Sequence, residues 1–187
     1  MQRGRRRLSR SDERIWSRSE AMVAVRVPPI PGLSAAALAI AEALGDGDRG
    51  RTQATSQRLV DALCRCLRVP PLRVEVCGTR PLNDYGELHG LYVPANGRRD
   101  RDRVQVWMRT ARRGQTVAFR TFLRTLLHEL CHHLDYEQFK LERSFHTSGF
   151  YKRESSLMYA VLPRNAEGSG VAREAAETMR SEGLDGA

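Results

Sequence analysis

One short run of residues, His128-Glu129-Leu130-Cys131-His132, combines side chains that can bind a metal ion with one that can move a proton. On a helix each residue advances about 100°, so His128 and His132 project from neighbouring turns of one face and can hold one ion together. Glu129 follows His128 directly, where its carboxylate can take a proton from a water molecule beside the ion. The spacing therefore predicts metal-assisted hydrolysis.

The helix expected to carry this motif has one face that packs and one that does not. Counted from Phe119, a set of apolar residues falls within about 60°, whereas His128 and His132 fall at about 180° and 220°. The apolar residues are Phe122, Leu123, Leu126, Leu130 and Leu134. Because the two histidines face away from the packing side, we expect them to border a cleft with room for a substrate.

The motif supplies two ligands, and a catalytic zinc site takes three protein ligands and keeps its fourth position for water. The metzincin pattern requires glycine at position 135 and histidine at position 138, where this chain has Asp135 and Gln138, so that class is excluded. Two candidates for the third ligand remain, His146 and Glu154. Glu154 follows His132 by 22 residues, which resembles the gluzincin arrangement.

The residues after the motif resemble a known family. A short loop leads to His146, and the aromatic residue Phe150 follows four positions later. In this order the sequence resembles the SprT-like and WLM group of small zincin metallopeptidases, which includes DNA–protein crosslink proteases. Over residues 72–162 the resemblance implies one zinc ion, held by His128, His132 and His146, with Glu129 as the base. The chain has no zinc ribbon, so the resemblance does not bring over the nucleic-acid role of SprT members.

Glu154 remains the rival to His146, because it lies in the apolar stripe of the helix expected over residues 149–162. The stripe consists of Phe150, Leu157, Met158 and Val161. A partly buried carboxylate needs a partner, which could be the metal, a ligand imidazole or an arginine. We favour His146 as the ligand and Glu154 as the group that orients one. If both bound the ion, the site would be closed and structural.

Other side chains near the motif could assist. Asp135, one turn beyond His132, could hold a ligand imidazole by its second nitrogen, although an exposed acidic residue fits as well. Tyr136 and Tyr151 could donate to the oxyanion that forms on the substrate, although ordinary packing also explains them. His89 falls in a strand expected to border the cleft, where a lone histidine is more often structural.

Periodicity predicts the elements that position these residues. We expect helices over residues 35–44, 52–67, 116–138 and 149–162, and strands over 72–76, 87–93 and 104–108. An Asn-Gly step between the last two strands favours an antiparallel hairpin. The expected fold class is α+β and zincin-like, with a small, mostly antiparallel three-stranded sheet, flanking helices and the motif on the active-site helix.

Charge and composition divide the chain further. Residues 1–26 hold eight arginines against three acidic residues, and a proline-rich stretch follows. We expect a basic, disordered arm over residues 1–31, a zincin-like metallopeptidase domain over 32–163 and a tail or weakly held helix over 164–187. Four cysteines are too few for a disulfide framework, and the pair Cys64 and Cys66 reads as packing. With no export signal or membrane span, we expect a cytoplasmic protein.

Two functions follow as expectations. The first is a zinc metallopeptidase in which Glu129 activates the attacking water and a protein or peptide is the substrate. The alternative is a nucleic-acid-associated binding protein with a structural zinc site, in which the arginine-rich arm contacts phosphates. Neither requires a membrane.

Overall fold

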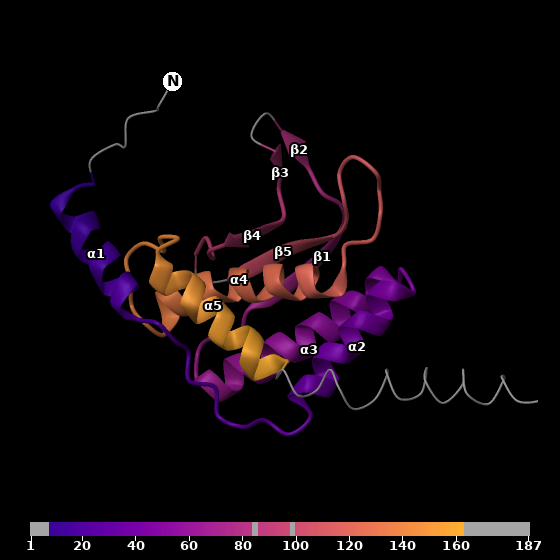
Figure 1. The fold of residues 1–187 in the computed structure, drawn as a ribbon, viewed down its shortest axis with the longest axis horizontal. Coiled ribbons are helices and arrows are strands. Elements are labelled where there is room, and N and C mark those ends of the chain that lie inside the picture. The colour runs from indigo at the N-terminus through magenta and orange to yellow at the C-terminus, as the bar shows by residue number, and fades with distance from the viewer. Residues whose placement is uncertain (1–7, 84–85, 98–99, 163–187) are drawn as a thin grey trace, which may run out of the picture.

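The computed structural model describes residues 8–83, 86–97 and 100–162 (Figure 1). The helices in this part of the chain are α1 (Arg10–Ala21), α2 (Leu33–Gly45), α3 (Arg49–Leu67), α4 (Phe119–Glu137) and α5 (Ser148–Val161). The strands are β1 (Arg73–Thr79), β2 (Leu82–Asn83), β3 (Gly86–Glu87), β4 (Gly90–Val93) and β5 (Arg103–Arg109). The expected α+β class is therefore confirmed, and the four predicted helices all form.

The main sheet is mixed, with strand order β1-β5-β4. The predicted hairpin is confirmed, since β4 pairs antiparallel with β5, but β1 pairs parallel with β5. The expectation of a mostly antiparallel sheet is therefore wrong. The reason is the chain path: the segment after β1 reverses before β4, so the hairpin returns β5 in the direction of β1. The strand expected over residues 87–93 is split, because Glu87 pairs with Leu82 in the β2–β3 ribbon.

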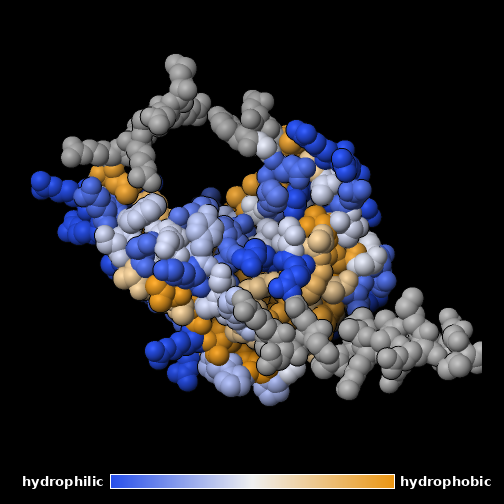
Figure 2. All heavy atoms as spheres, viewed as in Figure 1, coloured by the Kyte–Doolittle hydropathy of each residue, from blue (hydrophilic) through white to orange (hydrophobic). Residues whose placement is uncertain are grey.

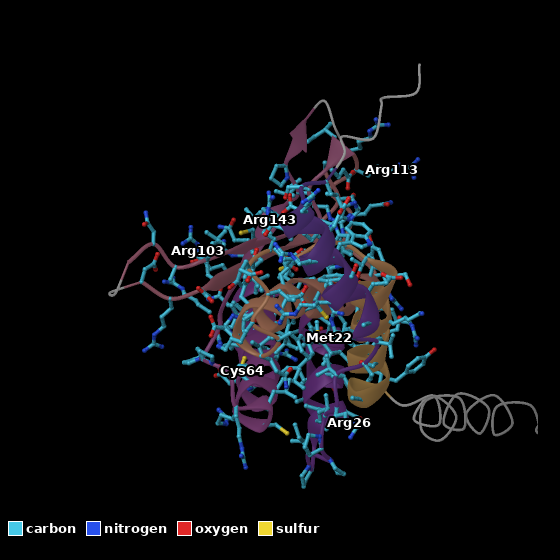
Figure 3. The ribbon with its side chains drawn as sticks, turned by 90° about the vertical axis from the view of Figure 1, so that its left-hand side faces the viewer. Met22, Arg26, Cys64, Arg103, Arg113 and Arg143 are labelled. Carbon is cyan, nitrogen blue, oxygen red and sulfur yellow. The ribbon has the colours of Figure 1, made fainter. Side chains whose placement is uncertain are left out.

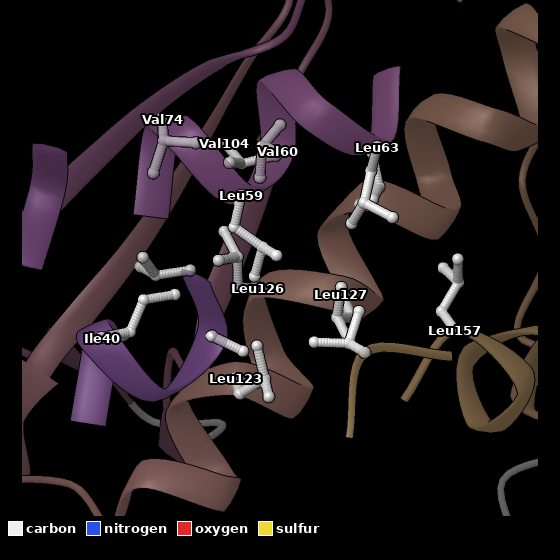
Figure 4. Packing of buried hydrophobic residues seen from close by; sticks show 14 of the residues in the cluster. Ile40, Leu59, Val60, Leu63, Val74, Val104, Leu123, Leu126, Leu127 and Leu157 are labelled. Carbon is white, nitrogen blue, oxygen red and sulfur yellow. The ribbon is translucent and has the colours of Figure 1, made fainter. Parts of the chain in front are cut away.

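Helices α3 and α4 pack against the sheet, and α2 and α5 pack on those helices. Figure 4 shows leucines of α3 and α4 meeting beside Val74 and Val104 of the sheet. The predicted packing face of α4 is confirmed, because its apolar residues from Phe122 to Leu134 are 0–1% exposed. Burial of each such leucine contributes roughly 1.5–3 kcal/mol. This packing turns the opposite face of α4 toward the cleft.

The N-terminal arm is ordered over much of its length, which corrects the expectation of a disordered extension. Ser9 caps α1 by accepting a hydrogen bond from the backbone N–H of Asp12. Ile15 and Ser19, about one turn apart, are buried where α1 packs on α5. Arg10, Arg14 and Arg18 therefore lie on a docked helix. Residues 1–7 and the expected C-terminal tail, 164–187, lie outside the described residues.

All four cysteines are free thiols, and Cys64 belongs to the hydrophobic core, as expected. Hydrophilic residues cover much of the surface in Figure 2, where apolar residues appear in separate patches. Among the described residues, no helix combines the length and the apolar character that crossing a bilayer requires.

Candidate metal centre

Three histidines meet at one end of the cleft. His128 and His132 project from α4, and His146 comes from residues 138–147, the segment between α4 and α5 that we name the histidine loop. The Nε2 atom of His146 lies 3.0 Å from Nε2 of His128 and 3.1 Å from Nε2 of His132. One ligand atom from each residue lies within 4.8 Å of the others. The structure thus gathers the three ligands that the motif and the resemblance implied.

This donor set fits a zinc ion. Zinc–nitrogen bonds of about 2.0–2.1 Å in a tetrahedral site require nitrogens roughly 3.3 Å apart, close to the observed separations. Burial, together with the neighbouring His128 and His146, lowers the pKa of His132 to about 3. Burial and His128 also lower the pKa of His146, despite the opposing charge of Glu154. Both imidazoles are therefore neutral at pH 7 and keep a lone pair for a metal.

A carboxylate supports the far side of His128. Its Nδ1 lies 2.9 Å from Oε2 of Glu154, whose Oε1 accepts a hydrogen bond of 2.6 Å from Arg124. Glu154 is buried, as its place in the apolar stripe predicted. Burial acts to raise its pKa, but the bonds from His128 and Arg124 outweigh this and lower it. The carboxylate thus contacts the nitrogen opposite the one that converges with the other histidines.

His132 is supported through a hydroxyl that the sequence did not reveal. Its Nδ1 lies 2.7 Å from Oγ of Ser144, and Ser144 donates a bond of 2.7 Å to Oδ2 of Asp135. Asp135 therefore reaches the imidazole only through Ser144, which lies between them. The alternative of an exposed acidic residue is wrong, because Asp135 is 0% exposed. Since the hydroxyl proton goes to Asp135, Oγ accepts the Nδ1 proton of His132, which leaves Nε2 unprotonated. A serine in a loop carries no sequence signal for this role.

Glu129 lies on the cleft wall beside strand β4, with 6% of its surface exposed. Burial raises its pKa to about 7, although His128 and a hydrogen bond from the backbone of Tyr92 oppose the rise. Gly90 permits this close approach, since a Cβ there would lie 2.7 Å from Thr125 and 2.9 Å from Cδ of Glu129. A glycine inside a strand was a signal of such an approach that sequence reasoning could have used.

The cleft beside these residues has a volume of about 670 Å³. One wall comes from β4 and the residues before it, and the other comes from α4. His89, expected to be structural, is instead exposed and lines this cavity. The histidines and Glu129 therefore face a space large enough for a section of peptide chain.

The two tyrosines considered as oxyanion donors lie in different places. Tyr136 lines the cleft and stacks on Tyr92, with ring centroids 5.7 Å apart. Tyr151 is 49% exposed and stacks on His146 at 5.9 Å between centroids. The hydroxyl of Tyr92 donates a bond of 2.6 Å to Asp102, so it is already engaged. Of the two candidates, Tyr136 is the one on the cleft wall.

Searches against protein families, curated proteins and solved structures gave no match for this chain.

Proposed function

We propose that this protein is a zinc-dependent metallopeptidase with a zincin-like fold, of the SprT-like and WLM type that its motif resembles. The observation that carries the proposal is the convergence of His128, His132 and His146 beside Glu129 on the wall of one cleft. Histidine nitrogens and a neighbouring buried carboxylate are the parts that metal-assisted hydrolysis of an amide requires.

In the proposed reaction Glu129 accepts a proton and later donates it. When bound, zinc supplies Lewis acidity, which polarises the peptide carbonyl and makes water more acidic. Glu129 takes a proton from the attacking water as the water oxygen bonds to the carbonyl carbon. It then delivers that proton to the amine nitrogen as the carbon–nitrogen bond breaks. The buried position of Glu129 on the cleft wall suits both transfers, because burial raises the pKa of a carboxyl group and makes its carboxylate a stronger base.

The set of three histidine donors favours catalysis over a purely structural site. Glu154, the rival to His146 as third ligand, and the nearby carboxylate of Asp135 are both held by other partners. Glu154 bonds Nδ1 of His128, and Asp135 bonds Ser144 and Arg153. Three protein ligands beside a cleft leave room for water and substrate, whereas a structural zinc site usually has four.

The substitution Glu129→Gln tests the proposal, because it removes the base and preserves the size of the side chain. We expect cleavage of an unfolded protein such as casein to fall about 10²–10⁴-fold. Zinc content, measured by mass spectrometry of the metal, should stay at about one ion per chain. The matched control is Glu42→Gln, at an exposed position on α2. Equal cleavage by wild type and Glu129→Gln contradicts the proposal.

A further inference from the structure

Helix α1 lies along the histidine loop, although more than 100 residues separate them in sequence. Figure 3 looks onto α1, with Arg143 labelled near its N-terminal end and Met22 near its C-terminal end. The contacts are Arg143 to Asp12 at 2.9 Å, the Trp16 and Phe145 rings at 5.7 Å, and Arg18 to the carbonyl of Phe139 at 3.2 Å. The loop that carries His146 therefore packs between α1 and the cleft.

Arg153 connects α1 to the interior of the site. This side chain of α5 is 0% exposed. Its Nη1 donates to the carbonyls of Ser19, at 2.7 Å, and Met22, where α1 ends. Its Nη2 donates to Oγ of Ser19 at 3.0 Å and to Oδ1 of Asp135 at 2.8 Å. Because Asp135 accepts from Ser144, an unbroken series of hydrogen bonds runs from α1 to His132.

The start of α5 is fitted to the backbone of α1. Thr147 caps α5 by accepting from the N–H of Phe150, and its hydroxyl lies 3.1 Å from that of Ser19. At Gly149 an added Cβ would overlap the carbonyl oxygens of Ser19 and Glu20. A side chain at position 149 would therefore force the two helices apart. Thr147 directly follows His146, so this contact also bears on the third ligand.

We propose that α1 is a positioning element of the metal site, and that Arg153 is the positioning residue through which its docking reaches His132 and the histidine loop. The inference rests on the proposed metal site. Docked α1 restricts the loop that bears His146 and Ser144, so less freedom is lost when a metal binds. By thermodynamic linkage, metal binding and α1 docking then favour each other by the same factor, typically about 5–150-fold.

The first test uses the unmodified full chain. Hydrogen exchange of the α1 amides, Arg10–Ala21, is measured without metal and with saturating Zn²⁺. Linkage predicts that Zn²⁺ slows exchange in α1 by about fivefold or more. Equal exchange rates with and without Zn²⁺ contradict the proposal. A helix that only stabilised the fold would slow by no more than α3, which packs on α2 and β1 and reports the general stabilisation by the metal.

The second test separates the helices with Gly149→Ala, which adds one methyl group and changes none of the ligands. Gly45→Ala is the matched control, because a Cβ there meets nothing within 4 Å. We expect faster trypsin cleavage after Arg14 and Arg18, a Zn²⁺ affinity about tenfold weaker by chelator competition, and an altered visible spectrum of the Co²⁺ form. The control should match wild type in all three.

The outcomes distinguish a failure of the coupling between α1 and the metal site from a failure of the metal site itself. Faster cleavage of α1 in Gly149→Ala with wild-type Zn²⁺ affinity overturns the coupling. Unchanged cleavage contradicts the close helix contact on which the proposal is built. His146→Ala serves as the reference for the site itself, since loss of a ligand should weaken Zn²⁺ binding strongly. If His146→Ala leaves Zn²⁺ affinity unchanged, the proposed metal site fails, whatever Gly149→Ala shows.

Discussion

A carboxylate–arginine pair supports the Nδ1 side of each motif histidine, and the two pairs differ sharply in burial. Glu154, which bonds His128, pairs with Arg124, whose side chain is 53% exposed. Asp135, which reaches His132 through a serine, pairs with Arg153, and both side chains of that pair are 0% exposed. One helix thus presents two candidate ligands, one supported at the cleft surface and one from the interior.

This difference in burial makes the support of His128 easier to change than the support of His132. An exposed ion pair is weakened by solvent and salt, so the support of His128 through Arg124 can change at low cost. A fully buried pair is costly to break, because the remaining charge is left without water or partner. The buried pair is also joined to α1, since Arg153 donates to the carbonyls of Ser19 and Met22 at the end of that helix. We call Glu154 and Arg124 the surface branch, and Ser144, Asp135 and Arg153 the interior branch. We therefore expect the interior branch to contribute more to the stability of the fold, and Glu154 of the surface branch to contribute most to metal affinity.

The largest expected effect is that of Arg153→Met, which leaves Asp135 buried without its cation. We expect the free energy of unfolding to fall by about 3–5 kcal/mol. Urea denaturation followed by circular dichroism measures it. Arg124→Met is the matched control and should cost no more than about 1 kcal/mol, because that pair is half exposed. Equal losses in the two variants contradict the distinction between the branches.

Glu154→Gln should have the next largest effect, on metal binding more than on folding. The substitution keeps the shape of the side chain but removes the negative charge that faces Nδ1 of His128. We expect Zn²⁺ affinity, measured by chelator competition, to fall about 10–100-fold. A Zn²⁺ affinity equal to that of wild type means that this carboxylate does not support the ligand.

Ser144→Ala breaks the interior branch at its hydroxyl and should weaken Zn²⁺ binding about tenfold. The effect should be smaller than that of Glu154→Gln, because a neutral hydroxyl polarises the imidazole less than a carboxylate does. Ser17→Ala, at an exposed position on α1, is the control and should bind Zn²⁺ as wild type does. A larger loss in Ser144→Ala than in Glu154→Gln reverses the proposed order of the branches.

Arg124→Ala should give the smallest effect. Glu154 keeps its bond to His128, so we expect less than about a fivefold loss of Zn²⁺ affinity. The difference from wild type should shrink between low salt and 1 M NaCl, because salt screens an exposed pair. Titrations at both salt concentrations check this. A loss that is independent of salt indicates a packing role for Arg124.

The sequence anticipated the features that depend on local geometry. Helical spacing alone placed His128 and His132 on the face of α4 opposite its leucines, and the structure has them there. Apolar phase predicted that Glu154 is buried, and it is. The parallel partner of β1 was missed, because strand alternation reports which side of a strand is buried and carries no information on direction.

The high charge of the N-terminal arm led to a wrong prediction of its structure. Its arginines suggested a solvated extension, but Ile15 and Ser19 dock α1 on α5. The arginines of that helix, Arg10, Arg14 and Arg18, are exposed, and Arg18 contacts the histidine loop. One apolar residue and one serine among many charged residues are too weak a pattern to predict a docked helix. The partners of α1 also lie more than 100 residues away in sequence, beyond the reach of local spacing.

The sequence alone therefore predicted the spacing of the two candidate ligands, the candidate base beside them and the amphipathic helix that carries all three, since each follows from the rotation of about 100° per residue. The tertiary structure decided which nitrogen each carboxylate supports and that Ser144 stands between Asp135 and His132. It also decided that α1 completes the interior branch through Arg153. These contacts join residues from separate elements, and only the packing of the whole chain brings such residues within hydrogen-bonding distance.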